Sequence, residues 1–210
     1  MAITSYAELQ AEIASWLNRD DLAGTIPSFI SLAERTMFRQ VRIRQMLKRV
    51  RATLDEDFET LPDDFLEAVS LKLLTTPETP VSAVEPAVMD MLKARGSTGR
   101  PRYFAPIGND LTVYPARDQD YTVELLYYAR PDALSGSVSS NVILATWPDL
   151  YLWGSLAASA PFLREDERIA TWGSLYRGSL AEVGEADPPV RAVAAPLLTE
   201  LSDFAALRGF

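Results

Sequence analysis

The sequence predicts an α+β fold, with a helical bundle from both chain ends and a central antiparallel β region. Apolar residues recur at helical spacing towards both ends, whereas the middle alternates as strands do. Of the 210 residues, 48% are hydrophobic and 23% charged, a composition that supplies a sizeable core. We expect one domain, 1–187, with helices at 5–43 and 147–184 around a β region at 46–130, and then a C-terminal tail, 188–210.

The first two helices follow from capping and periodicity. Ser5 and Glu8 have the spacing of a capping box, and residues 6–18 carry apolar side chains on one helical face. A second helix is expected to start near Pro27, a favoured first-turn residue, and to run to about Ile43.

The middle of the chain has the period of strands. Residues 48–54 alternate between apolar and polar side chains, which indicates a half-buried strand. Further strands are expected at 66–74 and 121–128, with a hairpin over 102–114. The proline-rich segment 75–86 is expected to be a loop before a short helix at 87–94.

Two more helices, at 147–163 and 165–183, precede a stop at Pro188-Pro189, because proline lacks the N–H that a helix needs. The tail beyond is expected either to fold back on its own subunit or to dock on a partner as an amphipathic segment. Its apolar residues are Val193, Leu197, Leu201, Phe204, Leu207 and Phe210.

Charge is unevenly distributed along this acidic chain, whose formal net charge is −9. Residues 35–51 hold seven basic and no acidic residues, whereas 55–67 hold seven carboxylates. Arg35, Arg39 and Arg42, at i, i+4 and i+7, are expected to form one basic ridge. The basic run could be a solvated face, a phosphate contact or a surface paired with an acidic neighbour, and the nearby carboxylates favour the last.

The absence of Cys and His excludes thiolate nucleophiles, histidine-based triads and the usual transition-metal sites. Carboxylate chemistry remains, and Glu124, on an apolar strand, and Glu165, at a helix start, are the least ordinary carboxylates. We expect Glu124 to point outward from its strand and Glu165 to interact with a helix dipole. No catalytic, cofactor or metal site is expected, and the chain is not expected to be an enzyme.

No membrane partner is expected, because no run approaches the roughly 18 apolar residues that span a bilayer. The amino terminus lacks the pattern of a secretory signal, so synthesis in the cytoplasm is expected.

Four motifs stand in a fixed order along residues 5–183. They are a helical pattern over 6–34, the run Leu61-Pro62-Asp63-Asp64-Phe65-Leu66-Glu67, Tyr114-Pro115 leading to Tyr127-Tyr128, and Trp147-Pro148-Asp149-Leu150-Tyr151 with the helix that follows. Together they resemble the head-to-tail adaptor proteins of tailed bacteriophages.

The resemblance implies a structural virion protein of the neck, made in the host cytoplasm. Such adaptors form a ring, usually of twelve subunits, beneath the portal at the capsid vertex. The ring joins the portal to a tail or nozzle protein, and DNA passes through its bore without sequence-specific binding. A carboxylate-based hydrolase of cell-wall glycan is the alternative, and a small regulatory binding module is a third possibility.

Two sets of site residues follow from these expectations. The tail residues named above are expected to contact the portal. An acidic face and a basic face on one subunit allow head-to-tail contacts, which close into rings. The candidate subunit-interface residues are Arg35, Arg39, Arg42, Arg49, Arg51, Asp55, Asp57, Asp63 and Asp64.

Overall fold

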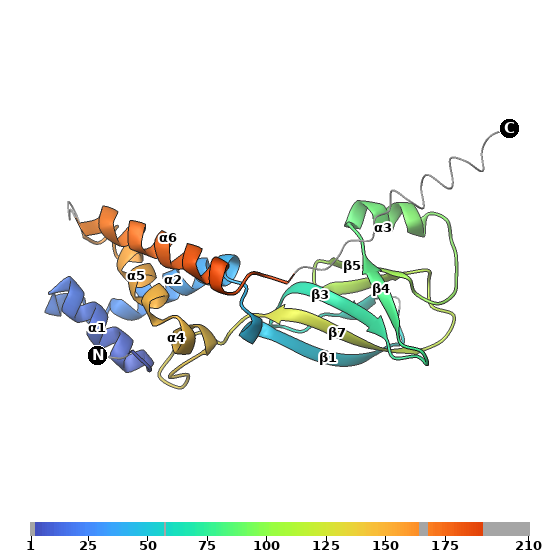
Figure 1. Ribbon diagram of the computed structural model, residues 1–210, viewed down its shortest axis with the longest axis horizontal. Helices are drawn as coiled ribbons and strands as arrows, with labels where there is room; N and C mark the ends of the chain where they lie inside the picture. Colours follow the sequence, from blue (N-terminus) through green and yellow to red (C-terminus); the bar gives the residue numbers. More distant parts are fainter. Residues whose placement is uncertain (1–2, 57, 164–167, 191–210) are drawn as a thin grey trace. The chain divides into compact units, whose positions relative to one another are not determined.

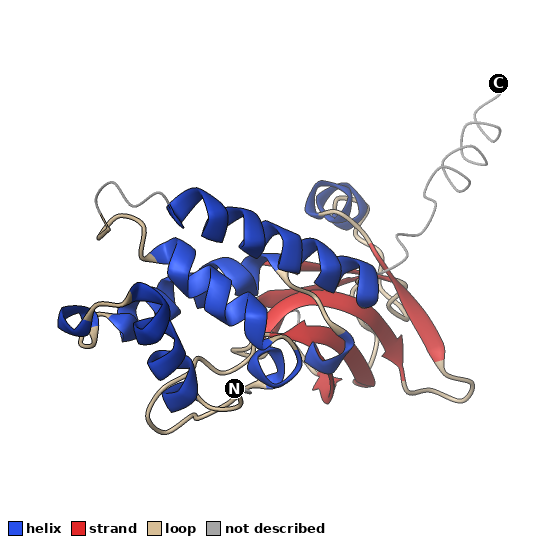
Figure 2. Ribbon diagram, turned by 60° about the vertical axis from the view of Figure 1, so that its left-hand side comes forward, coloured by secondary structure: helices blue, strands red, loops and turns tan. Residues whose placement is uncertain are grey.

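The computed structural model describes residues 3–56, 58–163 and 168–190 (Figure 1). The chain divides into two compact units, each described by itself. Of the described residues, the helical unit comprises those up to Met46 together with those from Arg130 to Pro189, and the sheet unit comprises those from Leu47 to Ala129 together with Val190. Helices and strands are both prominent (Figure 2), so the α+β class is confirmed. None of the described helices is long and apolar enough to cross a bilayer.

The helical unit begins with the expected capping box. The Ser5 hydroxyl accepts a hydrogen bond from the Glu8 N–H at 3.3 Å, and the Glu8 carboxylate accepts one from the Ser5 N–H at 3.1 Å. Asn18 ends this helix in the left-handed conformation with φ 52°. The helices are α1 Tyr6–Leu17, α2 Ile26–Gln40, α4 Val142–Thr146, α5 Pro148–Ala158 and α6 Arg168–Ala186, with 3-10 turns at Asp20–Leu22 and Arg44–Met46.

Helix α5 forms the centre of the helical unit, because α1, α2, α4 and α6 all pack against it. Its side chains are buried on most sides of the helix, and Tyr151 is completely buried. Phe29 of α2 and Trp172 of α6 are among the largest buried side chains of the same unit. Two expected boundaries are wrong by a turn or so: α2 ends at Gln40 rather than near Ile43, and α5 ends at Ala158 rather than near Leu163.

The sheet unit holds a seven-stranded sheet of order β1-β7-β3-β4-β5-β6-β2. Neighbouring strands are antiparallel except for β4 and β5, which are parallel. The elements are β1 Leu47–Leu54, β2 Phe58–Thr60, β3 Phe65–Leu73, β4 Thr79–Ala83, α3 Pro86–Lys93, β5 Tyr103–Ile107, β6 Asp110–Tyr114 and β7 Tyr121–Ala129.

The parallel pair corrects the expectation of an antiparallel β region. Helix α3 lies between β4 and β5 in sequence, and such a crossover lets the second strand run in the same direction as the first. The expected loop over 75–86 is also wrong, because it contains β4. Proline has no N–H to donate, so it is tolerated where a strand lacks a neighbour on one side. Pro80 meets this condition, because it is opposite Lys72 of β3 and the pairs with β5 begin only at Ser82.

Apolar side chains from one face of the strands form the core of the sheet unit. Leu71, Phe104, Val123 and Leu125 are nearly inaccessible within it. A smaller apolar cluster packs α3 against β5 and β6. It includes Met89 and Leu92 of α3, Ala105 of β5 and Tyr114 of β6. Because Val123 and Leu125 face the core, the intervening residue of β7 faces the other way.

Candidate subunit-interface surface

The basic ridge on α2 is shorter than expected. Arg35 and Arg39 are exposed on the helix, but the helix ends before Arg42. The Arg42 guanidinium donates to the carbonyl oxygens of Phe38, at 3.0 Å, and Val41, at 2.7 Å. Arg42 therefore covers carbonyl groups at the helix end, where a positive charge is also favoured by the helix dipole.

The second part of the basic run lies on β1, where Arg51 belongs to a cross-strand ion-pair network. Arg51 of β1, Glu124 of β7 and Lys72 of β3 are directly opposite one another in register. The Glu124 carboxylate lies 3.0 Å from both cations, and Lys72 also pairs with Glu78 at 3.0 Å. Glu124 points away from the core as expected, but the two cations cover it and leave 8% of its side chain exposed.

This network also argues against a general-acid role for Glu124. Hydrogen bonds from Lys72 and Arg51 lower the pKa of Glu124. A general acid in glycoside hydrolysis needs the opposite shift, towards a raised pKa. Glu165 lies outside the described residues. Within the described chain, no group of three or more carboxylates is placed to hold a metal ion.

The acidic segment is partly paired within its own unit. Asp64 accepts hydrogen bonds from Lys48 at 2.6 Å and from the Tyr127 hydroxyl at 2.9 Å. Burial alone would raise the pKa of Asp64, but these hydrogen bonds lower it overall. Burial, with the nearby Asp64, raises the pKa of Tyr127 to about 12.

Exposed carboxylates also lie along the acidic segment. Asp55 and Glu56 are exposed, and Asp63 is exposed in the turn before β3. Burial and the repulsion from Asp55 raise the pKa of Glu59, a sign that carboxylates crowd one another here. Asp57 lies outside the described residues.

The structure divides the expected interface residues between the two units. Arg35, Arg39 and Arg42 belong to the helical unit, while the other described members belong to the sheet unit. Of the seven basic residues between 35 and 51, Arg42, Arg44, Lys48 and Arg51 donate side-chain hydrogen bonds to other described residues, in the case of Arg44 to Asp187. Arg35, Arg39 and Arg49 are exposed and form no ion pair with another residue that the structure describes.

The chain leading into the tail is fixed by two contacts. In the helical unit, the Asp187 carboxylate accepts hydrogen bonds from the Arg44 N–H at 2.8 Å and its Nε at 2.9 Å. In the sheet unit, the Val190 N–H donates to the Tyr128 hydroxyl at 2.8 Å. The six apolar residues expected to contact the portal lie outside the described residues.

A buried polar network in the helical unit was missed by the sequence reasoning. The Glu34 carboxylate, 3% exposed, accepts hydrogen bonds from the Leu134 N–H at 2.7 Å and the Tyr151 hydroxyl at 3.0 Å. The side-chain amide of Asn141 donates to the Tyr151 hydroxyl at 2.6 Å. The available signal was spacing, because Glu34 follows Ile30 by four residues on the apolar face of α2.

Comparison with known proteins agrees with the order of motifs in the sequence. A family model described as SU10 adaptor protein matches residues 4–194. No curated protein matches the chain.

Proposed function

The chain belongs to the SU10 adaptor protein family, and on this premise we propose that it forms a ring beneath the portal that joins the capsid vertex to the tail. Membership confirms the interpretation of the sequence as a phage head-to-tail adaptor, a structural protein that associates with portal and tail proteins. We further propose that the ring contains twelve copies, that it lies in the virion neck and that DNA passes through it.

The distribution of charge on the described surface supports a head-to-tail contact between copies. Arg35 and Arg39 present cations on α2, whereas Asp55, Glu56 and Asp63 present carboxylates in the sheet unit. Opposite charges on different parts of one subunit are suited to a heterologous interface, which can close into a ring. Burial and repulsion from Asp55 together raise the pKa of Glu59, and a neighbour's arginines would relieve the repulsion.

The net charge of the subunit supports a channel through which DNA slides. At −9 per copy, a ring repels the phosphate backbone as a whole. Repulsion keeps the duplex from adhering to the wall during passage.

We assign the portal contact to the tail, through Val193, Leu197, Leu201, Phe204, Leu207 and Phe210. Apolar residues at helical spacing need a partner surface, because a segment of 21 residues gains little stability as an isolated helix. A groove on the portal would supply that surface.

Charge reversal on α2 tests the ring. The R35E/R39E variant, which leaves Arg42 on its helix-end carbonyls, is expected to remain folded and to lose ring assembly on portal particles in electron micrographs. Arg177→Glu, on the exposed side of α6, is the matched control and should assemble normally.

A charge swap identifies the partner carboxylates. Adding Asp55→Arg and Asp63→Arg to R35E/R39E should restore ring assembly, because the complementary pairs are rebuilt with opposite signs. Normal assembly of R35E/R39E at physiological salt would contradict the proposed contact.

A further inference from the structure

A second basic segment, separate from the proposed interface, surrounds the loop between α3 and β5. Residues 91–109 contain Lys93, Arg95, Arg100 and Arg102 and no acidic residue. In a chain with 29 acidic and 20 basic residues, four cations within ten positions form a local exception.

Glycines and backbone hydrogen bonds shape this loop. Gly96, with φ +64°, and Gly99, with φ +155°, adopt conformations that side chains rarely allow. The Gly99 N–H donates to the carbonyl of Ala116 at 2.7 Å, and the Ala116 N–H donates to the carbonyl of Ser97 at 3.0 Å. The loop is thereby held against the chain that follows β6.

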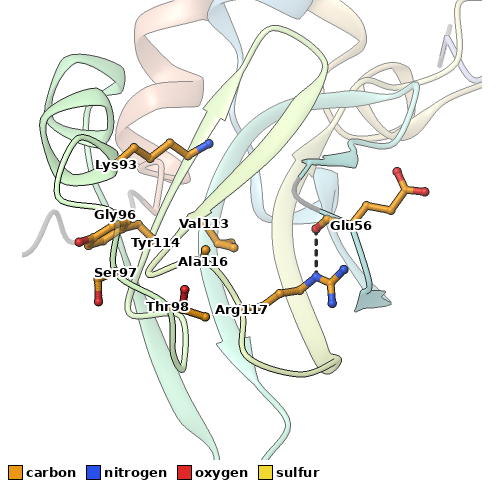
Figure 3. A pocket seen from close by; sticks show the side chains of 9 residues that line it. All are labelled: Glu56, Lys93, Gly96, Ser97, Thr98, Val113, Tyr114, Ala116 and Arg117. Carbon is orange, nitrogen blue, oxygen red and sulfur yellow. Dashed lines mark hydrogen bonds between the residues drawn. The ribbon is translucent and has the colours of Figure 1, made fainter.

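Two cavities share the central residues of the loop, Ser97 and Thr98. The smaller, of 310 Å³, also has Lys93, Glu56 and Arg117 in its wall (Figure 3). There Arg117 donates to the main-chain carbonyl of Glu56 at 3.4 Å and pairs with the Asp120 carboxylate at 2.9 Å. The pairing with Asp120 reduces the positive potential that Arg117 gives this cavity.

The larger cavity, of 480 Å³, is more strongly positive. The described residues that line it include Arg95, Arg100 and Arg102 and no carboxylate. The Arg100 guanidinium donates to the Thr79 hydroxyl at 3.3 Å, which positions it at the cavity wall. Hydroxyl groups of Ser97 and Thr98 add neutral donors to the same wall.

The helix dipole accounts for only part of this charge. Lys93 ends α3 and Arg95 follows it by two residues, where cations are favoured by the helix C-terminus. That influence fades within one turn, so it does not explain Arg100 and Arg102. Arg100 and Arg102 therefore place positive charge at the wall of the larger cavity, where an anion would be attracted.

We propose that the larger cavity binds the phosphate group of a nucleotide or of a nucleic-acid backbone. Guanidinium forks and hydroxyl donors that line one cavity suit an anion with several acceptor oxygens. The volume exceeds that of a single phosphate and falls in the range of cavities that hold small organic ligands. This site does not depend on ring formation or on the portal.

Binding of labelled short duplex DNA to the free protein, followed by fluorescence anisotropy at increasing salt, tests the site. The R100Q/R102Q variant is expected to bind about tenfold more weakly or worse, and its salt dependence should fall by about two ion equivalents. The matched control R19Q/R177Q removes the same charge from the helical unit and should bind as the unmodified protein does. A second variant, S97A/T98A, keeps every charge and should weaken binding by a smaller factor.

Competition identifies the source of the phosphate. Displacement of DNA by a free mononucleotide supports a nucleotide-sized site, whereas displacement by unlabelled DNA alone supports a backbone site. Equal DNA binding by R100Q/R102Q and R19Q/R177Q overturns the proposal. Displacement by polyglutamate but not by either phosphate ligand also overturns it, in favour of an acidic protein partner. Ring assembly on portal particles, measured separately, distinguishes these failures from a failure of the adaptor proposal.

Discussion

Glu34 and Glu124 are both buried carboxylates, yet their surroundings shift their pKa values in opposite directions. Burial raises the pKa of Glu34, and hydrogen bonds from Leu134 and Tyr151 offset this only in part. Hydrogen bonds from Lys72 and Arg51 lower the pKa of Glu124. The difference is the presence of cations: among the described residues, Glu34 has neutral donors alone.

We predict that E34Q is as stable as the unmodified protein at acid pH and more stable at neutral pH. A raised pKa means that protonation of Glu34 stabilises the fold below its ordinary pKa, and that this contribution is lost as pH rises through the raised value. Glutamine retains an acceptor for Leu134 and Tyr151 without the charge. Urea unfolding at several pH values measures the difference.

The comparison variant for this site is E34A, which leaves both donors without an acceptor. It should lower the free energy of unfolding by about 1–3 kcal/mol per unpaired group. An E34Q variant that loses stability as pH rises, relative to the unmodified protein, would show that the charged form is the favoured one.

We predict the opposite pH dependence for E124Q. A lowered pKa contributes stability above the ordinary pKa of a glutamate, and this is lost as pH falls through the lowered value. E124Q should therefore unfold at a lower temperature than the unmodified protein at neutral pH, with the gap closing in acid. E78Q removes the exposed partner of Lys72 and should have little effect. A constant gap between E124Q and the unmodified protein at all pH values would refute the assignment.

Among the helices, α5 depends on close packing at one small residue. A Cβ added at Gly154 would lie 3.1 Å from the ring of Tyr176 on α6 and 3.4 Å from the Cβ of Ala33 on α2. Gly154 thus sets how closely three helices approach one another in the helical unit.

We predict that Gly154→Val lowers the free energy of unfolding by about 1–3 kcal/mol, because the branched side chain overpacks this site. Gly178→Ala on α6 is the control, since nothing lies within 4 Å of its added Cβ. That variant should gain up to about 1 kcal/mol from helix propensity. Thermal unfolding followed by circular dichroism measures both. Equal stability of the two variants would show that the three helices can separate at no cost.

At the scale of the whole molecule, we propose that the tail contacts the portal and does not pack against the core of its own subunit. A chain that ends at Asp187 keeps Asp187 beside Arg44 and loses the Val190 contact with Tyr128. We predict that it melts within a few degrees of the full chain and no longer binds portal rings in a pull-down experiment. Loss of many degrees with portal binding retained would show that the tail belongs to the core of its own subunit.

Elements whose signals are local could be predicted from the amino-acid sequence. The capping box at Ser5 and Glu8, the alternation over 48–54 and the hairpin around Gly108 each depend on neighbours within a few residues. The order of motifs also sufficed for the adaptor interpretation, which the family match confirms. Strand β4 was not predicted, because Pro80 within it and Pro77 before it are typical of a loop, and its pairing depends on strands that are distant in the sequence.

Which charged side chains have partners could not be predicted, because it depends on the folded arrangement of distant segments. Arg51 and Glu124 are 73 positions apart in the sequence, and Glu34 and Tyr151 are 117 apart. Strand register and helix packing bring such residues together, and neither is encoded in local spacing. Within the basic run between 35 and 51, no local pattern separates Arg42 and Arg51, which hydrogen-bond within the chain, from Arg35 and Arg39. That separation depends on where α2 ends and on which strands flank β1. A charged side chain interacts with the groups that lie near it in space, whatever their distance along the sequence.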